Sequence, residues 1–240
     1  MIEPLHPWYW RSLSLNGKTG SEVFAALFLQ PGAIGTLLES PYSPQNQNSL
    51  ARYSICAGVP RIINGKHQLW TPPIGEILPF LHRLLAANSP RIQSSPNLPF
   101  TGGWLGWLGY DVAWEIERLP YYKSDSLPFP VAYWYEPECF AVLDHLEQNI
   151  WLAATELSQL DLLENKLENI KSEESLIIGE YSSIPIHFYT NQEDYEANVR
   201  QAKKYIQAGD IFQANLTLRF ETKTTADSWT IYRALQQINP

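Results

Sequence analysis

The chain has 240 residues, of which 45% are hydrophobic and 13% aromatic, while only 18% are charged. Disordered chains are poor in aromatic residues and rich in charge, so this composition predicts a folded globular protein. The 17 basic and 25 acidic residues give a net charge of −8 at pH 7. Non-specific binding to nucleic acid needs clustered Lys and Arg, so we expect no nucleic-acid partner.

Neither a membrane nor an oxidising compartment is indicated by the apolar runs and the cysteines. The longest apolar run, residues 23–29, is far shorter than the roughly 20 residues that span a bilayer. The first ten residues lack the pattern of a signal peptide. Cys56 and Cys139 stand far apart and form no disulfide framework, so we expect two small buried residues in a cytoplasmic protein.

Helices and strands alternate in the first part of the chain. Thr19 and Glu22 have the spacing of a capping box, which predicts that a helix begins there. Asn64 and Gly65 tolerate positive φ and predict a type I′ turn between two short strands. The predicted elements are a helix that ends before Pro31, strands over residues 33–39, 52–57, 62–63 and 69–70, and a helix over residues 76–88.

The second part begins with two predicted antiparallel strands, residues 140–143 and 150–154. A helix follows, with a capping-box spacing from Ser158 to Asp161 and a leucine stripe. The polar segment 171–183 is the best candidate for a domain boundary, and we divide the chain into domains 1–185 and 186–240. Beyond it we predict a helix over residues 191–208 with Thr190 and Glu193 as its capping box and Gly209 at its end, and a last helix over residues 228–238.

A strict alternation of apolar and polar residues over positions 211–221 predicts a strand with one buried face. Its polar side chains are Gln213, Asn215, Thr217 and Arg219. Four such groups in register suit either a solvated sheet surface or the wall of a cleft. The residues alone leave both interpretations open.

The usual catalytic and metal-binding motifs are absent from the sequence. It has no G-x-S-x-G elbow, no HExxH and no CxxC. Paired carboxylates such as Glu115 and Glu117 are interpreted as solvated faces, and His82 and His145 as solvated histidines. We therefore identify no catalytic residue and no metal ligand in this chain.

Several stretches together are typical of one enzyme family. They are the strand end Leu37-Leu38-Glu39-Ser40, Arg52-Tyr53-Ser54, the glycine-rich GGWLGWLGYD at 102–111, Glu117-Arg118, and YIQAGDIFQANLTLRF at 205–220. The chain resembles the chorismate-utilising amination enzymes, namely the large subunits (component I) of aminodeoxychorismate synthase (para-aminobenzoate synthase) and anthranilate synthase. Without the resemblance, the glycine-rich stretch is also explained as a closely packed core strand, and Glu39-Ser40 as a strand end capped into a turn.

The resemblance implies an α/β (α+β) fold in which antiparallel sheets face each other with helices outside. It implies that residues 1–185 form the N-terminal domain and that residues 186–240 begin a chorismate-binding domain that is incomplete. The family's catalytic groups and its Mg²⁺-binding carboxylates would lie in a later part, so the chain alone is expected to be inactive. Ammonia would come from a glutamine amidotransferase subunit or fused domain.

Two further points follow from the resemblance. Glu39 and Ser40 match the border of an amino-acid pocket that holds tryptophan in some members, where a carboxylate and a hydroxyl could receive an ammonium group. Residues 214–217, Ala-Asn-Leu-Thr, resemble the aminodeoxychorismate branch, which serves para-aminobenzoate and folate synthesis. The alternatives are the anthranilate branch of tryptophan synthesis, or a non-catalytic module that binds an amino acid or docks the glutaminase.

Overall fold

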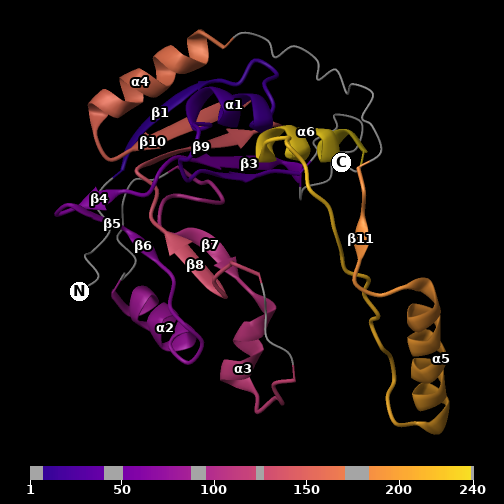
Figure 1. Ribbon diagram of the computed structural model, residues 1–240. Coiled ribbons are helices and arrows are strands. Elements are labelled where there is room, and N and C mark those ends of the chain that lie inside the picture. Colours follow the sequence, from indigo (N-terminus) through magenta and orange to yellow (C-terminus); the bar gives the residue numbers. More distant parts are fainter. Residues whose placement is uncertain (1–7, 41–50, 88–95, 123–126, 171–183, 239–240) are drawn as a thin grey trace. The chain divides into compact units, whose positions relative to one another are not determined.

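The computed structural model describes residues 8–40, 51–87, 96–122, 127–170 and 184–238. These residues fall into two compact units, Met1–Glu173 and Glu174–Pro240. Residues 171–183, where the sequence indicates a domain boundary, lie outside the described residues, and the division after residue 185 stays a prediction. Each unit is described by itself (Figure 1).

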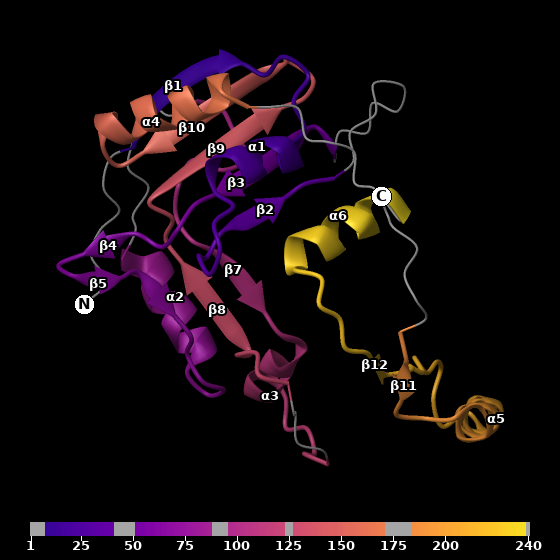
Figure 2. The same ribbon diagram turned by 45° about the horizontal axis from the view of Figure 1, so that its top comes forward.

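The first unit has a mixed α/β fold with antiparallel sheets, as the resemblance implies (Figures 1 and 2). A five-stranded sheet has the order β1-β10-β9-β3-β2, a three-stranded sheet has the order β6-β8-β7, and β4 and β5 form a hairpin. The strands are β1 (Tyr9–Ser14), β2 (Thr36–Leu38), β3 (Tyr53–Ala57), β4 (Ile62–Ile63), β5 (Lys66–His67), β6 (Leu69–Trp70), β7 (Leu105–Leu108), β8 (Ala132–Tyr135), β9 (Cys139–Asp144) and β10 (Asn149–Ala154). The helices are α1 (Gly20–Leu27), α2 (Ile77–Ala87), the 3₁₀ turn η2 (Tyr110–Val112), α3 (Ala113–Ile116) and α4 (Leu157–Glu168).

Strand β9 lies at the centre of the five-stranded sheet and is buried along nearly its whole length. Phe140 and Val142 belong to a core cluster that also contains Leu105 of β7 and Tyr135 of β8. The two sheets therefore share one hydrophobic core. The Tyr135 hydroxyl also donates to Thr36 Oγ1 of β2 at 2.8 Å, which adds a polar link between the sheets.

Side chains alternate along a strand, so the remaining side chains of β9 point to the opposite face of the sheet. Helices α1 and α4 cover this face. Both helices pack on the five-stranded sheet, α1 on β3 and α4 on β1 and β10, and they contact each other (Figure 2). The leucine stripe predicted for α4 is confirmed, since Leu160, Leu163 and Leu167 are buried. Burial of such side chains contributes about 1.5–3 kcal/mol each, which makes these helices part of the same folding unit.

Local turn chemistry is confirmed at some helix and hairpin ends and corrected at others. Thr19 and Glu22 form the predicted capping box of α1, and Gly209 ends α5 (Gln192–Ala208) with a φ of 80°. Asn64 and Gly65 both have positive φ, but they connect β4 to β5, whereas Leu69–Trp70 pairs with β8. The other two predicted caps are wrong: α4 begins after Glu156 with no side-chain cap, and α5 is capped by Asn191, whose Oδ1 accepts from Asp194 N.

The second unit contains β11 (His187–Phe188), α5, β12 (Phe220–Glu221) and α6 (Ser228–Ile238). The long strand predicted over residues 211–221 is wrong for most of its length, because only its last two residues pair, with β11. Both the apolar and the polar side chains of residues 211–220 are exposed, including Phe212 and Leu218. An alternating segment forms a strand only where another strand satisfies its backbone groups, and within the described residues β11 does so at two positions.

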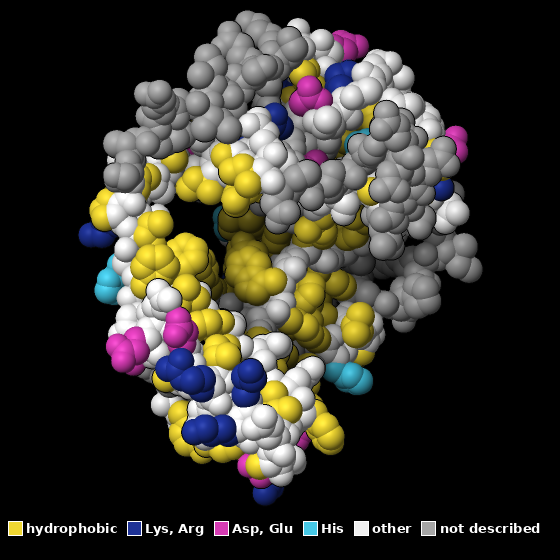
Figure 3. Space-filling view, turned by 90° about the vertical axis from the view of Figure 1, so that its right-hand side faces the viewer, with side chains coloured by type: hydrophobic (Ala, Val, Ile, Leu, Met, Phe, Trp, Pro, Cys, Tyr) yellow, Lys and Arg dark blue, Asp and Glu magenta, His cyan; other side chains and the backbone are white. Residues whose placement is uncertain are grey.

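Side chains of this unit are open to solvent on its helices as well. Neither α5 nor α6 has a buried residue. Figure 3 shows basic side chains beside hydrophobic ones in its lower part, where α5 lies, and α5 carries the exposed Arg200, Lys203 and Lys204. The buried face that the sequence predicts for the 211–221 segment is therefore not formed in this unit.

The glycine-rich stretch at 102–111 forms β7 and the turn into η2. At Gly106 an added Cβ would lie 1.8 Å from the carbonyl oxygen of Tyr133 in the paired strand β8. Trp107, one residue on, stacks on the Tyr133 ring with centroids 4.4 Å apart. The close packing expected of this stretch is supported, because glycine at 106 permits the approach of the two backbones. The expectation of a core strand is wrong beyond Leu105, since the other three residues of β7 are exposed.

We predict that Gly106→Ala lowers the free energy of unfolding by about 2 kcal/mol or more, because the new methyl group meets backbone that cannot move away cheaply. Gly109→Ala is the graded control, since its Cβ would lie 3.0 Å from the Val131 carbonyl oxygen. Urea unfolding followed by tryptophan fluorescence measures both. Equal losses in the two variants would contradict the prediction.

Candidate functional site

Two of the motifs singled out in the sequence meet at one end of the five-stranded sheet. Strands β2 and β3 are antiparallel with Leu38 opposite Ile55, so Glu39 comes next to Ser54 as the register continues. Ser54 Oγ and His145 Nε2 are 2.8 Å apart. We name the group formed by Gly20, Ser21, Glu39, Ser54 and His145 the Glu39 cluster.

The carboxylate of Glu39 lies against the first turn of α1. Ser21 Oγ donates a hydrogen bond of 2.5 Å to Glu39 Oε1. A Cβ added to Gly20 would lie 2.4 Å from Glu39 Oε2 and 2.9 Å from Ser54 Oγ, so only glycine leaves room for this carboxylate. The N-terminus of a helix carries a partial positive charge, which stabilises a carboxylate at this position.

His145 follows β9 and is 8% exposed, while Ser54 is 1% exposed. Burial lowers the pKa of His145, although the charges of Glu39 and Asp144 oppose the shift. The imidazole is therefore neutral at pH 7. The interpretation of His145 as a solvated histidine is wrong, because its amide continues the pairing of β9 with β3 by donating to the Arg52 carbonyl at 2.9 Å and its side chain is buried.

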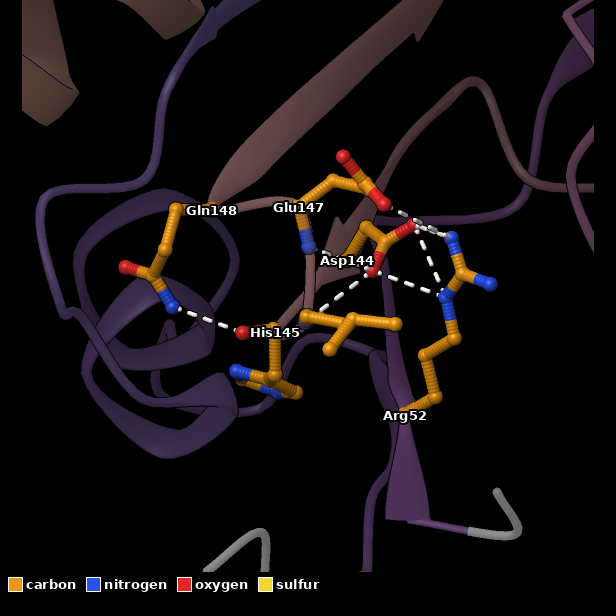
Figure 4. Close-up of polar contacts among 6 residues, drawn as sticks. Arg52, Asp144, His145, Glu147 and Gln148 are labelled. Atoms are coloured by element: carbon orange, nitrogen blue, oxygen red, sulfur yellow. Dashed lines mark hydrogen bonds and ion pairs between the residues drawn. The ribbon is translucent and has the colours of Figure 1, made fainter. Parts of the chain in front are cut away.

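Arg52 and Asp144 form a bidentate ion pair beside this turn (Figure 4). Arg52 Nε lies 3.0 Å from Asp144 Oδ1, and Arg52 Nη2 lies 2.6 Å from Asp144 Oδ2. Asp144 Oδ1 also accepts from the amides of Leu146 and Glu147, both at 3.1 Å. Burial alone would raise the pKa of Asp144, but these hydrogen bonds lower it below its ordinary value, so the carboxylate stays charged and fixes the turn.

The structure places the predicted site residues in both units. Glu39 is half-buried within the Glu39 cluster, and Ser40 is exposed beside it. Gln213, Asn215, Thr217 and Arg219 are all exposed in the second unit. Arg219 stacks its guanidinium over the Tyr189 ring at 4.7 Å.

The polar partners of Glu39 were missed in the sequence. The capping box at Thr19 and Glu22 marked the first turn of α1, but nothing in the sequence indicated that Gly20 and Ser21 would face the end of β2. The interpretation of Glu115 as part of a solvated face is also wrong. The Glu115 carboxylate accepts from the amides of Gly75, Ile77 and Leu78 at 2.6–2.8 Å and so caps α2 rather than lying free in solvent.

The part of the chain that the structure describes contains no cluster of side chains that could hold a metal ion. No three His, Cys, Asp or Glu side chains among those residues come together as ligands. The resemblance assigns the Mg²⁺ ligands to a later part of the protein, and that assignment stays a prediction. Cys56 is fully buried, and burial raises the pKa of its thiol well above the ordinary value.

Two pockets in the first unit are lined by residues other than Glu39 and Ser40. One of about 400 Å³ lies between α4 and the end of β1, with Lys18 and Glu164 in its wall. The other, of about 180 Å³, lies between α1 and α4 and includes Cys139. There burial raises the pKa of the Cys139 thiol to about 12, so this cysteine is no candidate nucleophile.

Comparison with known proteins identifies the class. Residues 37–240 match the family described as "chorismate binding enzyme", and the chain belongs to this family. A protein of Synechocystis sp. called "Anthranilate synthase component I-like protein" is 52% identical over 98% of this chain and 48% of its own length.

Enzymes of both branches are among the other relatives. Anthranilate synthase component 1 of Thermus thermophilus is 36% identical over 62% of this chain and 34% of its own length. Aminodeoxychorismate synthase component 1 of Klebsiella aerogenes is 28% identical over 95% of this chain and 51% of its own length. The chain thus spans about half of the length of the Synechocystis and Klebsiella relatives and about a third of the Thermus enzyme.

The fold has a counterpart among solved structures. Anthranilate synthase component I from Streptococcus pneumoniae TIGR4 superposes with a TM-score of 0.57 at 24% identity, covering 85% of this chain and 49% of that chain. The fold class implied by the resemblance is therefore confirmed. Among the described residues, no helix has the length and apolar character needed to cross a membrane.

We predict that the chain loses stability as the pH falls from 7.5 to 5.5, because His145 has a lower pKa folded than unfolded. In that window the unfolded chain binds more protons, and each unbalanced proton changes stability by at most about 1.4 kcal/mol per pH unit. His145→Gln should flatten the pH dependence of thermal unfolding. His82→Gln, on the exposed side of α2, should leave it unchanged. A dependence that persists in His145→Gln would refute the assignment.

Proposed function

We propose that this chain is the N-terminal portion of a component I enzyme that aminates chorismate. The observation that carries the proposal is the family match over residues 37–240, which includes the sixteen-residue segment from Tyr205 to Phe220. The catalytic groups are expected in a later part of the protein, as the resemblance implies. Mg²⁺ is the expected cofactor of the complete enzyme.

The product that we propose is 4-amino-4-deoxychorismate, the precursor of para-aminobenzoate in folate synthesis. Residues 214–217, Ala-Asn-Leu-Thr, favour this branch. The match to the Klebsiella aerogenes aminodeoxychorismate enzyme supports it by extending over 95% of the chain. In this reaction ammonia replaces a hydroxyl group of chorismate, and the enolpyruvyl group is retained.

Anthranilate synthesis is the second candidate, and a specific observation favours it. The Thermus thermophilus anthranilate enzyme is 36% identical, against 28% for the Klebsiella aerogenes enzyme, although over a shorter part of the chain. That reaction eliminates pyruvate after amination. The two candidates therefore differ in a product that is easily measured.

Either reaction needs ammonia, and this sequence has no G-x-C-x-G glutaminase nucleophile. A glutamine amidotransferase subunit or a fused domain is the proposed source. In the complete enzyme, Gln213, Asn215, Thr217 and Arg219 are proposed to line the chorismate cleft once the 211–221 segment pairs with further strands. All four side chains are exposed in the second unit, which is compatible with this role.

An amino-acid pocket at Glu39 and Ser40 is the third element of the proposal. Glu39 offers a carboxylate held by the α1 first turn, and Ser40, the next residue in the chain, is exposed and offers a hydroxyl. A carboxylate and a hydroxyl suit the ammonium group of a free amino acid, through charge-assisted hydrogen bonds. Tryptophan is the proposed ligand.

We predict that the full-length protein, with its glutaminase partner, chorismate, glutamine and Mg²⁺, forms 4-amino-4-deoxychorismate without releasing pyruvate. Coupled pyruvate detection and anthranilate fluorescence follow the reaction. Stoichiometric pyruvate and anthranilate would establish the second candidate instead. Residues 1–240 alone, supplied with ammonia, should show no turnover above a protein-free control.

We predict that Ser40→Ala weakens the binding of L-tryptophan about threefold to tenfold, since one hydrogen bond to the ligand is lost. Isothermal titration calorimetry on the full-length protein measures the affinity. Ser12→Ala, at an exposed serine of β1, is the matched control and should bind as the unaltered protein does. Unchanged binding in Ser40→Ala would place the pocket elsewhere.

A further inference from the structure

We propose that Gly20 and Ser21, in the first turn of α1, are positioning residues that orient the Glu39 carboxylate and make the pocket selective for ligands with a primary ammonium group. This inference rests on the amino-acid pocket proposed above. It adds two residues that do not have to touch the ligand. Their effect is exerted through the orientation of one carboxylate.

Gly20 provides the space that the carboxylate occupies. A methyl group at this position would lie 2.4 Å from Glu39 Oε2 and 2.9 Å from both Cβ and Oγ of Ser54. Ser54 is 1% exposed and its Cβ is held by strand β3, whereas Glu39 Oε2 is the end of a flexible side chain, so the carboxylate is the group that shifts. Any larger residue at position 20 must displace Glu39 Oε2 from its place against the helix.

Ser21 fixes the other oxygen. A carboxylate can only accept, so the Ser21 hydroxyl is the donor in its 2.5 Å hydrogen bond to Glu39 Oε1. Ser21 is 1% exposed, and its place in the first turn of α1 leaves the hydroxyl little freedom. A carboxylate has about four lone-pair sites, so this bond sets its orientation and leaves capacity for further donors.

The charge balance of the site favours a cationic ligand group. Arg52 is engaged with Asp144 in the bidentate pair, and burial lowers the pKa of His145, which disfavours its cationic form. Glu39 is half-buried, and charge interactions are stronger there than in bulk water. An ammonium group would therefore gain more from an oriented Glu39 than a neutral group would.

Two ligands that differ in the ammonium group test this selectivity. L-tryptophan carries the group and indole-3-propionate lacks it, so the ratio of their affinities measures ammonium recognition. Titration calorimetry at pH 7.5 on the full-length protein should show Ser21→Ala weakening tryptophan binding about threefold to tenfold while indole-3-propionate binds as before. Gly20→Ala should reduce the ratio further. Ser12→Ala is again the control.

A double-mutant cycle separates positioning from general structural damage. If Ser21 acts through Glu39, Ser21→Ala should cause no further loss of tryptophan affinity in a Glu39→Gln background. Additive losses, or an equal loss for both ligands, would overturn the positioning role. Unchanged tryptophan binding in Glu39→Gln would instead overturn the pocket itself, so the two failures are distinguishable.

Discussion

Burial of strand β9 on both of its faces is the constraint on which the first unit depends. Phe140 and Val142 complete the core shared with the three-stranded sheet, while the opposite face of the strand lies under α1 and α4. The Phe140 ring makes edge-on contacts with three other rings, those of Trp8, Trp10 and Phe100, with ring centroids 4.8–5.5 Å apart. A strand so enclosed cannot slip by one residue, because every side chain would then change faces.

The position of the Glu39 cluster follows from this fixed register. Asp144 ends β9 and pairs with Arg52, the residue before β3, and the next residue along the chain, His145, lies within hydrogen-bond distance of Ser54. Strand β3 in turn sets β2, which delivers Glu39 to the first turn of α1. The packing at the centre of the sheet therefore fixes the position of the Glu39 carboxylate at the end of the sheet. Recognition of a small polar ligand requires side chains that are held in place in this way.

The sequence predicted elements well where the signal was local. The capping box at Thr19, the positive φ at Asn64 and Gly65 and the leucine stripe of α4 depend on neighbouring residues, and the structure confirms them. The hairpin partner of Leu69–Trp70 depended on a distant strand and was wrong. The 211–221 alternation is as clear as any in the chain, yet pairing at most of its positions needs strands that the described residues do not supply.

The same limit applies to the candidate site. Glu39 and Ser40 could be predicted because they belong to a family motif. Ser21 and His145 act only through contacts with residues that are distant in the sequence. A lone histidine in a predicted turn gives no sign of burial. The residues missed are those whose roles arise from tertiary packing.

The three hydrogen bonds that the Glu115 carboxylate accepts from backbone amides have a consequence for the local dynamics of the three-stranded sheet. The hydrogen bond between Gly75 and Glu115 joins residues 40 positions apart, and β7 lies within the segment so closed. The start of α2 and the short helix α3 are thus fastened to each other at the two ends of that segment. Local opening is therefore expected to release both ends together as one cooperative unit, with the amides of Ile77 and Leu78 protected from hydrogen exchange by the same opening free energy.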